Sequence, residues 1–430
     1  MHMPRIIYTA LFIALIPAYF IRLTWRGIGN KKYLQRWGER IGIANVRPTK
    51  DKSIVWVHAV SVGEVNASIP LLRTLMEEYP GAEFLVTTST PTGSDILLSK
   101  LGNKVKHQYV PIDIPICINL FINTWKPKAL ILLETEIWPN IIHCCKKQGI
   151  ITALVNARLS EKSKSKYLRF SSLIQPAINS LDLILAQYKS DADRFNEIVV
   201  DKKIKLCGNL KFDQDMPEEL ESISGSIRDS WSIEGKRRPT LIAASTHEGE
   251  EVVILDAFNE ILKEINDALL ILVPRHLERF NRVKSLIDNQ GFNFSSRSKK
   301  EDVTNDTQVL LGDTMGELNF LYSVSDVAFV GGSLIDHGGQ NLLEPAAQGL
   351  PLCSGPSVRN FVEISNQLKK ASGLKIINNK NELANYFVDL IKKENLLKDY
   401  GQASKEIFIK NRGAIEIIKK TLQSLFKDLL

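Results

Sequence analysis

Short apolar runs of strand length alternate with amphipathic segments of helical period through most of the chain. In the first half the runs are SIVWVHA, EFLVTTS, ALILLET, TALVNA and DLILAQ. Such alternation is typical of parallel βαβ units, because two parallel strands need a crossover that usually contains a helix. After a less apolar interval at roughly residues 209 to 239, the pattern restarts with TLIAAS, ALLILVP, VLLGD and VAFVGGS. The restart predicts a second α/β domain.

Length and composition agree with two folded domains. The chain has 430 residues, of which 44% are hydrophobic and 24% charged, and a single domain usually holds about 150 residues. The net charge of +7 is too small to indicate a nucleic-acid partner, but it suits an anionic partner or a membrane surface. An odd number of cysteines without CxxC spacing argues against disulfides and a zinc site, so we expect reduced core thiols at Cys117, Cys144, Cys145, Cys207 and Cys353.

The N-terminus carries a different signal. Ile6 to Ile21 contains no charge and is slightly shorter than the roughly 20 apolar residues that cross a bilayer. A run of basic residues follows, and no small-x-small cleavage site does: Arg22, Arg26, Lys31, Lys32, Arg36 and Arg40. The positive-inside bias keeps such residues in the cytoplasm. We expect an uncleaved anchor that serves membrane encounter and not chemistry, with a membrane-surface helix or a buried core helix as alternatives.

We therefore divide the chain into an anchor at residues 1–25, a first domain at 26–225 and a second at 226–430. In open α/β sheets, ligands bind beyond the carboxyl ends of the strands. Glu64 follows the first strand at a helix start, where the helix dipole favours its ionised form. An ionised acid suits a general base for a hydroxyl nucleophile, although an acid in a first helical turn is also common in any protein.

Two further acids follow the third strand. Glu134 and Glu136 in LILLETEIWPN are expected on one face by strand alternation, so that one is hydrogen-bonded or protonated. Alternatively, one of them caps the next helix. Lys211 in GNLKFD lies near the domain junction, where a cation could meet an anionic donor.

The second domain contains features of a nucleotide site. In HGGQNLLEPAAQGLP two glycines allow close backbone approach, and Asn341 is expected to begin a helix whose free N–H groups suit a phosphate. Glu344 would accept hydrogen bonds from ribose hydroxyls, and Arg275 offers a bidentate cation. Neither GxxxxGK[ST] nor GxGxxG occurs, and the histidines do not have HExxH spacing. These absences weigh against a P-loop enzyme, a dinucleotide fold and a metal site.

Several longer motifs carry a resemblance to a known family. WVHAVSVGE, TTSTPTG, ETEIWPN, NARLSEKS, GNLKFD, PRH, GDTMGEL and GGSL…HGGQNLLEPAAQGLP occur in this order. The chain resembles the 3-deoxy-D-manno-octulosonic acid (Kdo) transferases of Gram-negative bacteria over nearly its whole length. The resemblance implies a GT-B fold of two facing Rossmann-like domains with a cleft between them, and a last helix that returns to the first domain. It also implies CMP-Kdo as donor and lipid IVA, the lipid A precursor in the inner membrane, as acceptor.

The resemblance also implies roles for individual residues. Glu64 would accept the proton of a glucosamine hydroxyl, while Glu134 and Lys211 would stabilise the transition state of an inverting displacement. Contacts with CMP would fall on Pro274, Arg275, Met315, Gly316, Glu317, Asn341, Leu342, Leu343 and Glu344. The reaction needs no bound cofactor or metal, and no nucleic acid takes part.

Two alternatives to this interpretation remain. A nucleotide-sugar epimerase has the same architecture but needs neither an anchor nor a lipid. A membrane-tethered binding protein would hold the nucleotide sugar without catalysis. The number of Kdo residues added and the acyl pattern of the acceptor are not encoded in these motifs.

Overall fold

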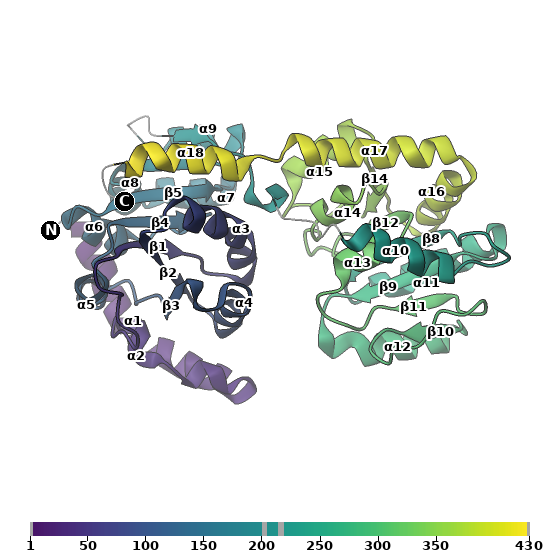
Figure 1. The fold of residues 1–430 in the computed structure, drawn as a ribbon, viewed down its shortest axis with the longest axis horizontal. Coiled ribbons are helices and arrows are strands. Elements are labelled where there is room, and N and C mark those ends of the chain that lie inside the picture. Colours follow the sequence, from purple (N-terminus) through teal and green to yellow (C-terminus); the bar gives the residue numbers. More distant parts are fainter. Residues whose placement is uncertain (1–2, 200–203, 214–218, 428–430) are drawn as a thin grey trace. The chain divides into compact units, whose positions relative to one another are not determined.

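The structure is a computed structural model that describes residues 3–199, 204–213 and 219–427. The chain forms two compact units (Figure 1): Met1–Asp215 with Arg412–Leu430, and Met216–Asn411. The division therefore falls at residue 215 and not at the expected 225. The reason is that α10 (Glu219–Ser230) packs against α13 (Leu318–Ser323) of the second unit, where Arg228 also pairs with Asp326.

The first unit is built on a seven-stranded sheet in the order β3-β2-β1-β4-β5-β6-β7, and all its pairs are parallel. Its strands are β1 (Ser53–His58), β2 (Ala82–Thr88), β3 (Lys106–Tyr109), β4 (Ala129–Leu133), β5 (Ile151–Ala157), β6 (Leu183–Ala186) and β7 (Ile204–Leu206). β1 pairs with both β2 and β4, so Trp56 lies opposite Leu85 on one side and Leu130 on the other. The strand order reverses between β1 and β4, which is where open α/β sheets bind ligands.

Helices cover both faces of this sheet, as expected for parallel strands. One face carries α3 (Val62–Glu78), α4 (Pro91–Leu101) and α18 (Ala414–Phe426), and the other carries α5 (Pro115–Trp125), α6 (Pro139–Lys147), α8 (Ser171–Asn179) and α9 (Lys189–Asn196). β1 serves both cores, because Val55 faces the first and Trp56 the second. Between these elements lie η1 (Lys31–Leu34), α2 (Trp37–Arg40), η2 (Gly102–Lys104), α7 (Glu161–Arg169) and η3 (Leu210–Asp213).

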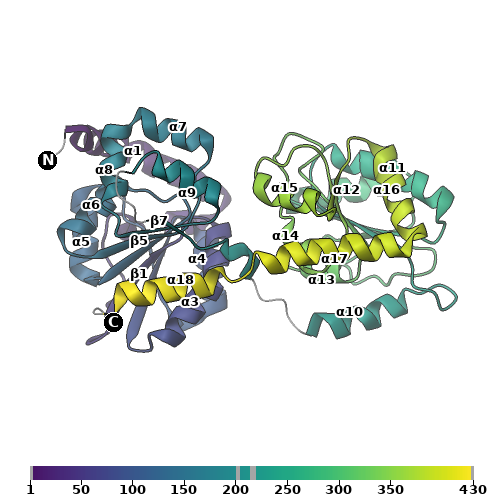
Figure 2. The ribbon, with the colours of Figure 1, turned by 90° about the horizontal axis from the view of Figure 1, so that it is seen from above.

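The last helix, α18, belongs to the first unit although it follows the second in sequence (Figure 2). Ile418 and Phe426 are buried in the same core as α3. Asp213 accepts hydrogen bonds from the backbone N–H groups of Gly413 and Ile415 at 2.7 and 2.6 Å. This carboxylate ties the start of the helix to η3.

The N-terminal helix α1 (Met3–Gly29) is longer than its apolar run. An 18-residue window has a mean hydropathy of 2.0, and only 6% of that window is buried. By length and composition α1 is a candidate membrane anchor, and its exposure excludes the alternative of a buried core helix. One side of the helix nevertheless contacts α6, α8 and η1 of the first unit.

The second unit repeats the plan with a parallel seven-stranded sheet in the order β10-β11-β9-β8-β12-β13-β14. Its strands are β8 (Thr240–Thr246), β9 (Leu269–Pro274), β10 (Phe294–Ser296), β11 (Val309–Leu311), β12 (Val327–Val330), β13 (Leu352–Ser354) and β14 (Leu374–Ile376). Its remaining helices are α11 (Glu250–Glu264), η4 (Leu277–Arg279), α12 (Phe280–Asn289), α14 (Leu343–Ala347), α15 (Val362–Lys370), α16 (Lys380–Lys392) and α17 (Glu394–Lys410). Phe258 of α11 and Phe387 of α16 lie in its main core. Two Rossmann-like units confirm the expected fold class.

Candidate functional site

Glu64 is held in one position at the start of α3, just beyond β1. Ser61 is the N-cap residue, and its hydroxyl accepts the Glu64 N–H at 3.2 Å while donating to Glu64 Oε1 at 2.8 Å. The Val60 N–H donates to Glu64 Oε2 at 2.8 Å. This reciprocal arrangement resembles a capping box, in which the third helical residue reaches back over the cap. Because only 8% of Glu64 is exposed, the carboxylate is both fixed and largely dry.

Burial raises the pKa of Glu64 above its ordinary value. Hydrogen bonds from Val60 and Ser61 lower the pKa, and the charge of Glu134 raises it further, but burial is the largest effect. Burial therefore acts against the helix dipole, which was expected to favour the ionised form. A raised pKa makes the ionised carboxylate a stronger base, which suits proton abstraction from a hydroxyl.

Glu134 and Glu136 lie beyond the end of β4, which stops at Leu133. Glu134 adopts a left-handed conformation with φ of 54°. Strand alternation therefore does not place these two side chains, contrary to the expectation. Neither caps α6, because the N-cap residue is Trp138 and it makes no side-chain capping bond. Instead the Trp138 indole N–H donates to Glu136 Oε2 at 2.7 Å.

The pKa of Glu136 is raised to about 7, first by burial and then by the charge of Glu64. The Trp138 hydrogen bond lowers this pKa, and the charge of Glu134 raises it. Three carboxylates thus share one partly dry site, where burial first and the neighbouring negative charges second raise the pKa of Glu136.

Lys211 supplies the positive charge of this site. Its Nζ lies 3.4 Å from Glu134 Oε1. The Leu210 N–H donates to Asn156 Oδ1 at 3.1 Å, which attaches η3 to the end of β5. Glu134 and Lys211 are thus in contact. The end of β4 with its left-handed Glu134 contributes one side chain, and η3 contributes the other.

His58 is a site residue to which the sequence analysis assigned no role. It is fully buried at the end of β1, and burial lowers its pKa to about 4. Its Nδ1 lies 2.9 Å from Thr87 Oγ1, and its Nε2 lies 3.9 Å from Glu136 Oε2. A neutral imidazole therefore lies next to Glu136. In the sequence, the position of His58 in WVHAVSVGE, between the apolar run and Glu64, could have indicated a role in the site.

In the second unit, Arg275 and Glu344 lie near enough to interact. Arg275 directly follows β9, which ends at Pro274, and its N–H donates to the Thr246 carbonyl at 3.0 Å. Burial raises the pKa of Glu344, while a hydrogen bond from Asn341 and the charge of Arg275 lower it. Glu344 offers a carboxylate acceptor and Arg275 a cation, and this is the combination expected for binding the ribose and the phosphate of a nucleotide.

The turn before α14 differs from the expectation. The helix begins at Leu343, with Leu342 as its N-cap residue, and not at Asn341. Asn341 Oδ1 accepts the Leu343 N–H at 3.0 Å, and its amide donates to Glu344 Oε1 at 2.9 Å. An asparagine side chain thus already occupies one of the N–H groups that were expected to face a phosphate.

The remaining predicted contacts lie in the loop between β11 and α13. Gly316 has a φ of +86°, a conformation that favours glycine, and the neighbouring Met315 is 62% exposed. Arg297 Nη2 donates to Glu317 Oε1 at 2.6 Å, and this hydrogen bond is the main cause of a lowered pKa at Glu317. β11, β9, β8 and β12 are neighbours in the sheet, so the predicted nucleotide residues follow strands of one region.

Glu250 is a structural residue of this region that the sequence analysis did not identify. It is fully buried and accepts hydrogen bonds from the N–H groups of Gly332, Ser333 and Leu334 at 2.7 to 2.9 Å. The carboxylate therefore shapes the glycine loop after β12. In the sequence it resembles any acid in a first helical turn, and only the fold reveals its partners.

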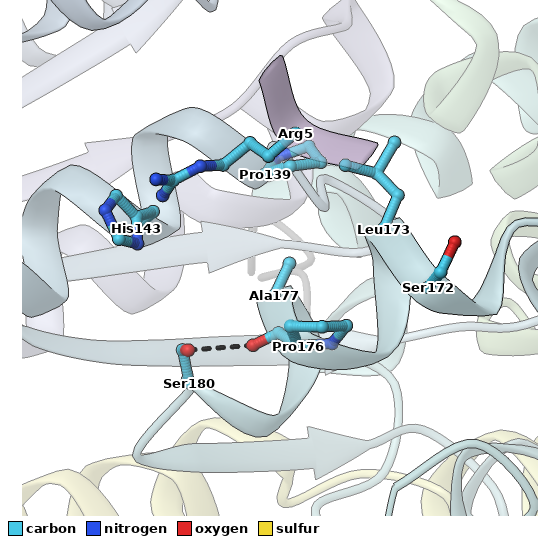
Figure 3. A pocket seen from close by; sticks show the side chains of 8 residues that line it. All are labelled: Arg5, Pro139, His143, Ser172, Leu173, Pro176, Ala177 and Ser180. Atoms are coloured by element: carbon cyan, nitrogen blue, oxygen red, sulfur yellow. Dashed lines mark hydrogen bonds between the residues drawn. The ribbon is translucent and has the colours of Figure 1, made fainter. Parts of the chain in front are cut away.

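A small hollow of about 170 Å³ lies between α1, α6 and α8 of the first unit (Figure 3). Arg5 and His143 are among its lining residues, and Ser180 Oγ donates to the Pro176 carbonyl at 2.7 Å. The hollow contains none of the predicted site residues.

Known proteins match the chain over nearly its whole length. A family model described as 3-deoxy-D-manno-octulosonic-acid transferase (kdotransferase) matches residues 35–214. A 3-deoxy-D-manno-octulosonic acid transferase of Haemophilus influenzae is 38% identical over 414 residues, covering 96% of this chain and 96% of that protein. A protein of the same name from Rickettsia bellii is 30% identical over 434 residues, covering 99% of each chain.

Solved structures share the fold at lower identity. A UDP-GlcNAc 2-epimerase from Neisseria meningitidis bound to UDP-GlcNAc is 16% identical, with a TM-score of 0.61, covering 86% of this chain and all of that one (100%). A glycosyltransferase from Rickettsia africae is also 16% identical, with a TM-score of 0.58, covering 88% of this chain and 98% of that one. These likenesses support a GT-B fold and carry no information about the reaction.

Proposed function

Since this chain belongs to the family of Kdo transferases, as its relationship to the Haemophilus influenzae protein shows, we propose that it transfers Kdo from CMP-Kdo to lipid IVA. Glu64 is the general base of this reaction in our proposal. The observation that carries the role is the fixed, largely buried carboxylate with a raised pKa at the carboxyl end of β1. A base held in one orientation contributes most when its pKa lies near the working pH.

The acceptor hydroxyl gives its proton to Glu64 as its oxygen attacks the anomeric carbon of Kdo. The bond from that carbon to the phosphate oxygen of CMP breaks, and the configuration inverts. Both Glu64 oxygens already accept one hydrogen bond, from Val60 and Ser61, and each can accept another. The existing bonds hold the carboxylate in place while the remaining capacity serves the substrate.

Lys211 and Glu134 stabilise the charges that develop during the transfer. The Lys211 ammonium, held 3.4 Å from Glu134 Oε1, offers a cation to the anionic donor. Such a charge is most effective where little water screens it. The left-handed backbone of Glu134 supports this role, because strained conformations often occur at functional sites.

The second unit binds the CMP part of the donor in this proposal. Arg275 neutralises phosphate charge, and Glu344 accepts a hydrogen bond from a ribose hydroxyl. The loop at Met315 to Glu317 and the turn at Asn341 to Leu343 complete the nucleotide site. α1 holds the enzyme at the cytoplasmic side of the inner membrane, where the positive-inside bias of its flanking residues would place it.

One incubation tests the reaction. The full-length protein is mixed with CMP-Kdo and lipid IVA, and the lipid is analysed by mass spectrometry. We expect a mass increase equal to one or more Kdo residues together with release of CMP, and the increase also gives the number transferred. Consumption of the nucleotide sugar without lipid, or an unchanged lipid mass, would contradict the proposal.

A further inference from the structure

A cavity of about 480 Å³ lies between α1 and the carboxyl edge of the first sheet. Phe12, Leu15 and Ile16 line it from the helix, whereas Val60 and Trp138 line it from the loops after β1 and β4. Its volume is in the range of small-molecule sites, about 300 to 1,000 Å³. α1 is therefore one wall of a cavity as well as an exposed apolar helix.

Polar contacts hold α1 in this position. The Tyr8 hydroxyl donates to Asp113 Oδ2 at 2.7 Å, and the Asn140 amide donates to Thr9 Oγ1 at 3.0 Å. Tyr19 also lines the cavity, and its hydroxyl accepts a hydrogen bond from the buried Arg40 at 2.8 Å. Breaking buried hydrogen bonds is costly, so this stretch of α1 stays on the first unit.

The polarity of the cavity lining changes along α1. Its lining is apolar at Phe12, Leu15 and Ile16, and cationic one to three turns later at Arg22 and Arg26. Both arginines are exposed, and neither has an ion-pair partner among the residues that the structure describes. The Arg26 guanidinium lies over the Tyr33 ring, 5.2 Å from its centroid, and this contact leaves its charge available to an anion. An apolar stretch beside these two cations suits an acyl chain attached to a phosphorylated head group.

The cavity also adjoins two residues that orient carboxylates of the proposed site. Val60 lines the cavity, and its N–H is the donor to Glu64 Oε2. Trp138 lines it as well, and its indole N–H is the donor to Glu136 Oε2. A ligand in the cavity therefore touches the residues that orient both carboxylates.

We propose that this cavity binds the lipid acceptor itself, with one acyl chain against Phe12, Leu15 and Ile16 and a phosphate at Arg22 and Arg26. The inference rests on the proposed function and extends it, because α1 becomes part of the acceptor site. This differs from the expectation that the N-terminal segment serves only membrane encounter. The charge pattern and the contact with the residues around Glu64 favour the acceptor over a bystander lipid.

A matched pair of substitutions tests the apolar part. Leu15 and Leu11 are both 59% exposed, but only Leu15 lines the cavity. Leu15→Trp should weaken binding of lipid IVA in detergent about tenfold, the loss expected when two methylene groups are no longer buried. Leu11→Trp should bind like the wild type. Native mass spectrometry measures binding without turnover, and CMP affinity and the melting temperature should be unchanged in both variants.

A second pair tests the cationic part. The Arg22→Gln/Arg26→Gln variant should lose about ten- to a hundredfold in affinity for lipid IVA, as expected when hydrogen bonds between charged groups are lost. It should bind a dephosphorylated acceptor like the wild type. The control Arg47→Gln/Lys50→Gln removes the same charge from exposed residues outside the cavity and should have no effect.

The outcomes separate this inference from the proposed function. Equal effects of Leu15→Trp and Leu11→Trp would overturn the cavity site, and so would displacement of lipid IVA by an equal amount of phosphatidylglycerol. Absence of Kdo transfer by the wild type would instead contradict the proposed reaction. In that case the binding measurements would still report whether the cavity holds the lipid.

Discussion

At the residue scale, the site depends on two largely buried carboxylates, Glu64 and Glu136, that lie close to each other. Glu64 and Glu136 both have raised pKa values, mainly through burial. Glu136 is raised to about 7, partly by the charge of Glu64. In the proposed mechanism Glu136 keeps its proton near neutral pH while Glu64 acts as the base, so the two glutamates have different roles within one site.

The first prediction concerns Glu64. Glu64→Gln keeps a similar shape and still accepts the Val60 N–H, but it cannot take a proton. We expect Kdo transfer to fall by about two to four orders of magnitude, the usual contribution of a positioned base. CMP affinity, measured by calorimetry, should be that of the wild type. A variant with near-normal transfer would remove Glu64 from this role.

The second prediction concerns Glu136 and the pH dependence of stability. Its pKa is about 7 in the folded protein against an ordinary value of 4.5, so the folded state holds its proton more tightly than the unfolded state. Between those two values the unfolded state binds fewer protons, and this group makes stability fall as pH rises. Glu136→Gln removes this contribution to the pH dependence of stability. The melting temperature of the variant minus that of the wild type should therefore be larger at pH 8 than at pH 4.5. The same difference at both pH values would contradict the assignment.

At the element scale, short turns at the carboxyl ends of strands determine where the functional groups lie. The turn before α14 is already folded by Asn341, which binds both the Leu343 N–H and Glu344. The half-buried Glu344 carboxylate therefore has a fixed direction before the nucleotide arrives. Such preorganisation reduces the entropy lost on binding.

The third prediction tests this turn. Glu344→Ala should weaken CMP binding by about 1.5 to 3 kcal/mol, the cost of a lost hydrogen bond to a charged group. Glu363→Ala is the control, because Glu363 also lies in the first turn of a helix but is exposed and outside the predicted site. Calorimetry with CMP measures both. Equal affinity of the two variants would place the ribose elsewhere.

At the scale of the whole molecule, the chain leaves the first unit after η3 and returns to it through α18. Asp213 ties the two crossing segments together through the N–H groups of Gly413 and Ile415. Only 7% of Asp213 is exposed, so its hydrogen bonds are protected from water. The C-terminal helix thereby completes a core that the first 215 residues leave open.

The fourth prediction follows from this connection. Asp213→Ala leaves two N–H groups without their carboxylate and should cost the first unit about 2 kcal/mol or more. CMP affinity of the second unit should not change. Asp193→Ala serves as the control, since its ion pair with Lys189 is exposed and should contribute less than about 1 kcal/mol. Urea denaturation of both variants provides the comparison, and equal losses would show that Asp213 does not support α18.

The sequence alone determined the two parallel sheets, because strand-length apolar runs alternating with amphipathic segments have few other ways to bury both faces. It also placed Glu64 at the start of the helix after the first strand, because the end of an apolar run and the helical period that follows it are local patterns. Only the tertiary structure brought Lys211 to Glu134 and turned Glu134 out of the strand, because that contact joins segments far apart in sequence. Likewise, hydropathy identified α1 as an apolar helix, but its packing through Tyr8 and Thr9 created the cavity beside Glu64. Local patterns are encoded by neighbouring residues, whereas burial, pKa and cavity shape arise from residues that only the fold brings together.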